Sequence, residues 1–361
     1  MTISNKSKVL SDVSFITTVY NEGENIIEFL KSLMNQTAMP GEIIIIDGGS
    51  KDNTVKSTLN FFEEESSRES NGFNILLFDD SDKKKPGNGR QNNKSAIIVR
   101  VIKKNGANIS QGRNTAIKSA AGRIICVSDA GCVIDRHWLE EITGSYSDAS
   151  CNVVGGLNLP LCRNFLQKCL AVCIMPHKEE IDRENYMPSS RNISFRKKIW
   201  MDAGGYPEDM EYGEDMKFDF NIKAAGYNIK FNPDAVVYWK MRENPVQISR
   251  QFFRYAKGDA RGRMYLHRHL IRFFSFLALL AILLCAIFLS KWIFLILIPL
   301  FIAYAYKPYC RLIKACMGKG NCRFNMIGKV LSAFIIPLIL LQIDFSKMSG
   351  YIYGLLKKQI L

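Results

Sequence analysis

The sequence has no long apolar run before Ile271 and no zinc-type spacing among its ten cysteines. Residues 1–10 are polar and contain no apolar signal region, so we expect the part of the chain before Ile271 to stay in the cytosol. In a reducing cytosol the cysteines should be free structural thiols. The chain also lacks a P-loop, a dinucleotide glycine fingerprint, a Ser-His-Asp arrangement and internal repeats. These absences argue against the enzyme classes that depend on such motifs.

Positive charge is abundant, with a formal net charge of +14. A nucleic-acid-binding protein could carry such a charge, but no interleaved aromatic platform accompanies it. The cations instead gather before and between the apolar stretches: Arg250, Arg254, Lys257, Arg261, Arg263, Arg268 and Arg272, then Lys307, Arg311, Lys314, Lys319 and Arg323. Basic residues beside apolar spans mark the cytoplasmic side and attract anionic lipid. We therefore expect a membrane partner and no nucleic acid.

The pattern up to residue 245 predicts an α/β domain. Residues 13–19 and 42–46 have the apolar, β-branched composition of buried strands, and residues 24–36 between them have helical apolar spacing. Strand, helix and strand in this length predict a parallel pair with a right-handed crossover. We expect Pro40 and Gly41 to separate the helix from the second strand. Similar strands and helices follow, so the fold class is a Rossmann-like, mostly parallel sheet flanked by helices.

The rest of the chain divides by composition. Within the domain of residues 1–245, residues 79–95 are charged and predict an exposed insertion. A basic amphipathic helix lying in the membrane interface is expected over residues 246–270 and an interfacial tail over residues 346–361. The region of residues 271–345 predicts C-terminal transmembrane helices, at about residues 271–289, 292–306 and 326–343. The first two are short for a full span, so a re-entrant hairpin remains an alternative.

Carboxylates stand where a ligand would bind. Asp47 and Asp129 each follow a predicted parallel strand, and ligands of open α/β sheets bind at the carboxyl ends of strands. An Asp-Gly turn is the alternative for Asp47. Glu214 and Asp215 open a predicted helix, where the helix dipole stabilises a carboxylate and keeps it ionised, as a base must be. Spacing alone favours the simple first-turn interpretation for this pair.

Several segments together resemble the family 2 glycosyltransferases, which have a GT-A fold. The segments run in the family's order across residues 13–255: residues 18–22 (TVYNE), 46–54 (IDGGSKDNT), 111–114 (QGRN), 128–131 (SDAG), 192–196 (NISFR), 204–206 (GGY), 213–215 (GED) and 251–255 (QFFRY). Each motif is weak by itself, and their order and spacing carry the resemblance.

The resemblance implies roles for individual residues. Tyr20, Glu22 and Asp47 would bind the base and ribose of a nucleotide-sugar donor, and Arg113 would lie near the nucleotide. Asp129 would face the ribose and diphosphate. Asp215, with Glu214 beside it, would deprotonate the acceptor hydroxyl, which attacks the anomeric carbon with inversion.

The resemblance also implies a divalent cation, magnesium or manganese, with Asp129 as its ligand. The second carboxylate of the family's D-x-D element is Gly131 here, so the metal would need Asp129 and the diphosphate, or some other ligand. Arg242 or Arg254 could carry part of that positive charge instead.

Gln251, Arg254 and Tyr255 resemble the Q-x-x-R-W motif of processive polysaccharide synthases, with Tyr in place of Trp. An interfacial helix with snorkelling arginines is the alternative. No apolar span precedes Ile271, so we favour transfer of a single sugar to a membrane lipid or lipid-linked saccharide acceptor. A processive synthase and a non-enzymatic nucleotide-sugar-binding protein remain the alternatives. The expected location is the cell (inner) membrane, with the catalytic domain cytoplasmic.

Overall fold

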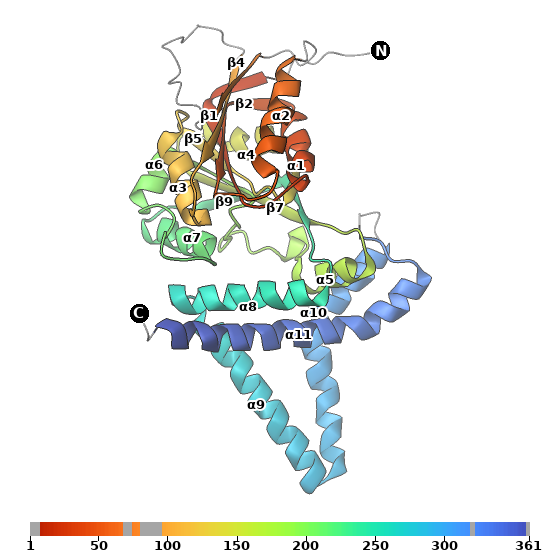
Figure 1. Ribbon diagram of the computed structural model, residues 1–361. Helices are drawn as coiled ribbons and strands as arrows, with labels where there is room; N and C mark the ends of the chain where they lie inside the picture. The colour runs from red at the N-terminus through yellow and green to blue at the C-terminus, as the bar shows by residue number, and fades with distance from the viewer. Residues whose placement is uncertain (1–7, 68–73, 80–95, 318–321, 359–361) are drawn as a thin grey trace. The chain divides into compact units, whose positions relative to one another are not determined.

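The computed structural model describes residues 8–67, 74–79, 96–317 and 322–358. The chain forms two compact units, one of residues 1–159 and 181–239 and one of residues 160–180 and 240–361 (Figure 1). The expected insertion at residues 79–95 lies outside the described residues except for its first residue. Asp79 is the last residue of a strand, β3 (Asn74–Asp79).

The described part of the first unit contains a nine-stranded sheet with the order β3-β4-β2-β1-β5-β8-β7-β9-β6. Its other strands are β1 (Lys8–Val19), β2 (Ala38–Asp47), β4 (Ala96–Lys103), β5 (Ile124–Val127), β6 (Cys132–Ile134), β7 (Val153–Leu161), β8 (Ile193–Arg196) and β9 (Ile229–Lys240). Neighbouring strands from β3 to β5 pair in parallel, whereas β8 pairs antiparallel with β5 and β7, and β6 with β9. The α/β class is confirmed, and the sheet is mixed.

Helices cover both faces of this sheet (Figure 1). Successive strand residues point to opposite faces, so Phe15 belongs to one core and Ile16 to the other. The Phe15 core is closed by α1 (Asn25–Met34), α2 (Thr54–Ser67) and α4 (Trp138–Gly144). The Ile16 core is closed by α3 (Ile109–Ser119), α6 (Lys197–Asp202) and α7 (Glu214–Ala224). A short 3-10 helix, η2 (Ser145–Ser147), follows α4.

Pro40 and Gly41 do not separate α1 from the second strand, because both lie inside β2. The pairing register of β1 and β2 shifts between Leu10 and Ser14, opposite these residues. A Cβ on Gly41 would lie 2.9 Å from Ser11 Cα, so the close approach at this bulge requires glycine. The expectation of a break here was wrong, since a bulge accommodates both residues within the strand.

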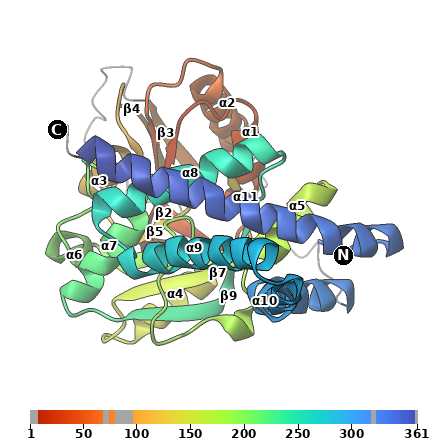
Figure 2. The same cartoon turned by 90° about the horizontal axis from the view of Figure 1, so that it is seen from below.

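The second unit is helical, with α5 (Phe165–Ile174), η3 (Lys178–Glu180), α8 (Pro245–Gly262), α9 (Leu266–Phe288), η4 (Lys291–Ile296), α10 (Leu297–Met317) and α11 (Met326–Lys358). Helices α8 and α11 lie side by side (Figures 1 and 2). Their close approach depends on glycine, because a Cβ on Gly350 would lie 2.2 Å from the Phe253 carbonyl oxygen. The segments expected at residues 326–343 and 346–361 belong largely to this one helix, which continues through Pro337.

Helices α9 and α10 form a hairpin that projects away from α8 and α11, with η4 at its tip (Figure 1). At its base Arg272 and Tyr304 both donate to the Asp344 carboxylate, at 2.7 Å each. Among the described residues, three helices are long and apolar enough to cross a membrane: residues 266–288, 291–317 and 326–357. The expected apolar C-terminal helices are therefore confirmed.

The expectation that all cysteines are free thiols was wrong for one pair. Cys162 and Cys322 form a disulfide within the second unit, 160 residues apart in sequence. The chain segment before α5 meets the segment before α11 at this point, and sequence spacing gives no sign of that meeting. The other eight cysteines are free.

Candidate active site

The carboxyl ends of the parallel strands meet at one edge of the sheet in the first unit. Val19 of β1 is in register with Asp47 of β2, which is in register with Lys103 of β4. Val127 ends β5 beside them, so Asp129 follows at the same edge. This alignment brings together the strand ends that the sequence analysis selected.

The loops after β1 and β2 are tied to each other. Asn21 has a left-handed backbone (φ 52°), and its side-chain oxygen accepts from the Lys51 amide at 2.9 Å. Thr54 Oγ1 accepts from the amides of Glu22 and Gly23, both at 2.9 Å. Tyr20 is left 57% exposed at the end of this paired loop. An aromatic ring held there has the freedom to stack on a planar base.

The side chain of Asp47 is fully buried and stabilises the turn that directly follows it. Its carboxylate accepts from the Gly49 and Ser50 amides at 3.0 Å each. Gly49 adopts φ +97°, which a residue with a side chain rarely does. The Asp-Gly turn weighed as an alternative for Asp47 is therefore present, and a carboxylate held this way can shape the edge of a ligand site.

Arg113 lies in a buried position on α3 and bridges two elements. Its guanidinium donates to Glu214 Oε1 and to Asp129 Oδ1, both at 2.8 Å, and lies over the Tyr206 ring. Burial acts to lower the pKa of Arg113, but the Asp129 and Glu214 carboxylates outweigh it and raise the pKa above its ordinary value. The residue is thus a permanent cation that positions Asp129 and Glu214.

Glu214 and Asp215 occupy the first turn of α7, which begins after Gly213 in a left-handed conformation. Burial, helped by the nearby charge of Asp215, raises the pKa of Glu214 to about 7. Asp215 is only half-buried, and its Oδ2 accepts from Ser189 Oγ at 3.1 Å. The two neighbours therefore differ: Glu214 is held inside by Arg113, and Asp215 has access to the surface.

One turn further along α7, Asp219 is almost fully buried. Within the described residues its Oδ2 has no hydrogen-bond partner. Burial, followed by the nearby Asp215 charge, raises the pKa of Asp219 well above its usual range. Of the three acidic side chains on α7, Asp215 is therefore the one that is not buried.

Arg191 and Trp239 belong to this edge and were missed in the sequence. The Arg191 guanidinium stacks 3.9 Å above the Trp239 ring, and its Nε lies 3.9 Å from Asp129 Oδ2. Trp239 is paired with Cys132 between β9 and β6. Arg191 lies just before β8 and Trp239 near the end of β9, so no local spacing in the sequence could have indicated their contact.

The asparagine of the NISFR segment has a structural role. The buried Asn192 accepts from Trp138 Nε1 at 2.7 Å and donates to the Leu157 and Ala235 carbonyls at 3.0 Å each. A Cβ on Gly156 would lie 2.3 Å from the Asn192 side-chain oxygen. This segment of the resemblance therefore holds β7, β8 and β9 in place beside the site.

The side chains present do not make a ligand set for a divalent cation. Both carboxylate oxygens of Asp129 lie near guanidinium groups, and Gly131 has no side chain that could ligate a metal ion. In the part of the chain that the structure describes, no three His, Cys, Asp or Glu side chains cluster closely enough to hold a metal ion. A magnesium or manganese ion at Asp129 would have to share this carboxylate with Arg113 and Arg191.

The four remaining candidate residues lie in the second unit. Arg242 Nε donates to the Gln251 side-chain oxygen at 2.9 Å, and Gln251 Nε2 donates to the Tyr255 hydroxyl at 2.9 Å. Arg254, on the same helix α8, is exposed. This chain of contacts fixes Arg242 and Tyr255 relative to α8.

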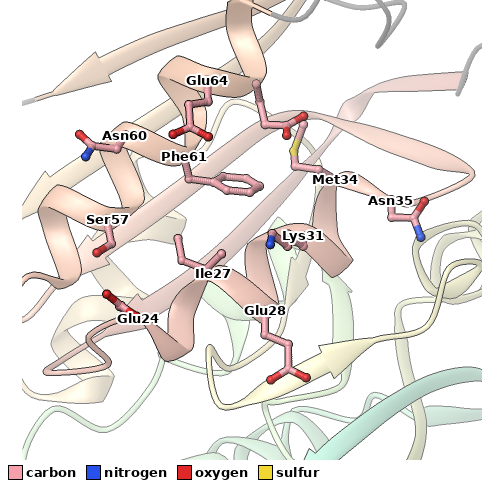
Figure 3. Close-up of a pocket in the computed structure, with 11 residues that line it drawn as sticks. Glu24, Ile27, Glu28, Lys31, Met34, Asn35, Ser57, Asn60, Phe61 and Glu64 are labelled. Atoms are coloured by element: carbon pink, nitrogen blue, oxygen red, sulfur yellow. The ribbon is translucent and has the colours of Figure 1, made fainter.

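A cavity of about 870 Å³ lies between α1 and α2, and none of the candidate residues lines it (Figure 3). Glu24, Glu28 and Glu64 surround it, with Lys31 among them (Figure 3). Its acidic lining would repel a diphosphate. We therefore place the candidate site at the strand ends and not in this cavity.

Two models of glycosyltransferases match the chain. The model of glycosyl transferase family 2 matches residues 14–70, which contain the ends of β1 and β2. The model of glycosyl transferase family group 2 matches residues 183–340, which contain Arg191, Asp215 and the apolar helices. Together the matched regions cover more than half of the chain.

Curated relatives of this chain are glycosyltransferases as well. The chain is 26% identical over 258 residues to glycosyltransferase AglE of Haloferax volcanii, covering 70% of this chain and 74% of the relative. It is 23% identical over 255 residues to the O-antigen chain rhamnosyltransferase RfbN of Salmonella typhimurium, covering 67% and 70%.

A solved structure has the same fold. The mannosyltransferase PcManGT from Pyrobaculum calidifontis, in complex with GDP-Man and Mn²⁺, aligns with a TM-score of 0.53 at 17% identity, covering 97% of this chain and 87% of that one. The sheet order, the strand-end carboxylates and these matches lead to one conclusion: the chain is a family 2 glycosyltransferase with a GT-A fold.

Proposed function

We propose that the protein transfers a single sugar from a nucleotide-diphospho-sugar to a hydroxyl of a membrane-associated acceptor, with inversion and with Asp215 as general base. The acceptor that we favour is a lipid-linked saccharide. The proposal rests on the different environments of two neighbouring residues of α7. Glu214 is bound by the buried Arg113, whereas the Asp215 carboxylate remains accessible.

The reaction that we propose is one displacement. The acceptor oxygen forms a bond to the anomeric carbon while the bond from that carbon to the diphosphate oxygen breaks, and the nucleoside diphosphate leaves with the electron pair. The acceptor proton moves to the Asp215 carboxylate. Ser189 donates to Asp215 Oδ2 and the Met216 amide donates to Asp215 Oδ1, and these two hydrogen bonds would orient the carboxylate for this task.

The donor would bind along the strand ends. Tyr20 is exposed for stacking on the base, and Glu22 and Asp47 border the same loops. Asp129, which accepts from Arg113, would face the ribose and diphosphate. Negative charge that grows on the leaving diphosphate needs fixed cations in a site of this kind.

The second unit supports a membrane acceptor. Two of its apolar helices, α9 and α10, are almost entirely exposed along the hairpin, as segments surrounded by lipid would be. A cavity of about 760 Å³ between the starts of α5 and α11 is lined by Arg163, Lys168, Arg323 and Lys329. Cations at the end of an apolar helix favour anionic lipid head groups. Gln251, Arg254 and Tyr255 on α8 would bind the acceptor.

The cations beside the apolar helices support an inner-membrane location with the first unit on the cytoplasmic side. The Cys162–Cys322 disulfide is uncommon in a reducing compartment, so orientation needs its own test. Ser66 is exposed on α2, so a Ser66→Cys variant can be labelled with a membrane-impermeant maleimide. Labelling above wild type only in inverted vesicles supports the cytoplasmic side, and labelling in intact cells contradicts it.

The experiment that tests the function is donor turnover by the full-length protein in detergent, with a panel of nucleotide-sugars and membrane lipid extract. Release of nucleoside diphosphate that depends on the extract, with a product one sugar heavier, supports single transfer. A ladder of longer products favours a processive synthase. Nucleotide-sugar binding without any release favours a non-enzymatic binding protein.

A further inference from the structure

We propose that Arg191, held against Trp239, binds the donor diphosphate in this chain and takes the place of a protein-bound divalent cation. The inference rests on the proposed function and adds to it the group that carries the positive charge. It starts from the ligand set of the site, which offers a metal ion no cluster of side chains within the described residues.

The position of Arg191 follows from the sheet. Trp239 is in register with Cys132, the residue directly after Gly131, and the Arg191 guanidinium lies 3.9 Å above the Trp239 ring. The cation therefore stands beside the position where the family has its second carboxylate. An ideal Cβ on Gly131 would meet no atom within 4 Å, so space for a ligand group is open there.

Arg191 differs from Arg113 in what it can reach. The Arg113 side chain is 2% exposed, and its two terminal nitrogens are used by Asp129 and Glu214. The Arg191 side chain is 15% exposed and lies farther from Asp129, at 3.9 Å. An incoming anion can therefore approach Arg191, whereas Arg113 is enclosed.

The chemistry of the pair suits a diphosphate. A guanidinium presents several N–H donors in one plane and binds phosphate oxygens in pairs, and stacking on an aromatic ring fixes that plane before the ligand arrives. A lysine has neither property, so arginine is the cation expected for a site built in this way. Asp129 then orients the ribose and keeps Arg191 in place instead of ligating a metal.

The test is calorimetric binding of UDP, GDP and dTDP, and of the corresponding monophosphates, to the full-length protein in detergent with EDTA. We expect diphosphate binding to persist in EDTA. Arg191→Met should weaken it about 10- to 100-fold, because charge-assisted hydrogen bonds are lost, and should change monophosphate binding much less. Arg191→Lys should recover part of the loss. Equal thermal midpoints of the variants would show that folding is unaffected.

A double variant that exchanges the two features tests the inference in a second way. Gly131→Asp combined with Arg191→Met restores the carboxylate and removes the cation, so we expect diphosphate binding that is recovered by Mn²⁺ and lost again with EDTA. Wild-type binding that requires Mn²⁺, or an Arg191→Met variant that binds diphosphates like the wild type, would overturn the inference. Absence of binding by the wild type to any nucleotide would instead overturn the proposed function.

Discussion

The buried bridge from Arg113 to Asp129 and Glu214 gives a prediction whose magnitude follows from the structure. Arg113→Met keeps the approximate size of the side chain but removes two charge-assisted hydrogen bonds of 2.8 Å. It also leaves Glu214 buried without its cation. Removing one partner of a buried ion pair typically costs about 3–5 kcal/mol of the free energy of unfolding.

The assay is thermal unfolding of the full-length protein in detergent, followed by tryptophan fluorescence. For a domain of this size, about 3–5 kcal/mol corresponds to a fall in the melting temperature of about 6–20 °C. Without the Arg113 charge the pKa of Glu214 in the folded variant should rise further, so the folded variant keeps this proton above pH 7, whereas the folded wild type and both unfolded chains have lost it. The stability difference between wild type and variant should therefore grow above pH 7 by about 1.4 kcal/mol per pH unit over that range.

A double variant separates charge from packing. Glu214→Gln in the Arg113→Met background removes the uncompensated carboxylate, so we expect it to restore much of the lost stability. A loss below about 1 kcal/mol for Arg113→Met, or strictly additive effects of the two substitutions, would refute the interpretation of Arg113 as the positioning cation.

Further predictions concern Glu214 and two tightly packed glycines. The pKa of Glu214 is raised from 4.5 to about 7 in the folded protein, so its contribution to stability is fully present below pH 4.5 and is lost as the pH rises to about 7. Glu214→Gln should therefore flatten the fall in melting temperature over this range, and an unchanged pH profile would count against the raised pKa. Gly112→Ala should destabilise the protein by about 1–3 kcal/mol, because the new Cβ would lie 2.7 Å from Thr18 Cγ2. Lys118→Ala on the exposed side of α3 is the control, and a stabilised Gly112→Ala variant would contradict the packing. Gly350→Ala should separate α8 from α11, with Ser349→Ala as control. Faster amide hydrogen exchange in both helices would report the separation, and unchanged exchange would mean that they do not pack as described.

The sequence predicted the parts of the fold that depend on local pattern. Apolar, β-branched runs identified β1 and β2, and the strand-end rule placed Asp47 and Asp129 at one edge, where both are found. The same rules could not foresee that Pro40 and Gly41 lie within β2, since a bulge depends on the partner strand.

Contacts between distant strands explain what the sequence could not indicate. Arg191 and Trp239 are 48 positions apart, one just before β8 and the other near the end of β9, and they meet only in the folded domain. The Cys162–Cys322 pair likewise depends on how α5 and α11 begin near one another. A pattern read along one chain contains periodicity and spacing, but it does not contain the register of antiparallel strands.

The central claim is that Asp215 removes the acceptor proton during sugar transfer. The most direct measurement is a single-turnover comparison of wild type and Asp215→Asn, with donor binding and release of nucleoside diphosphate followed in the same samples with lipid extract. We predict that the variant binds donor within about threefold of the wild type and loses at least about 100-fold in the rate of release, as expected when a general base is removed. A variant that turns over at the wild-type rate would contradict the account, because another group would then take the proton.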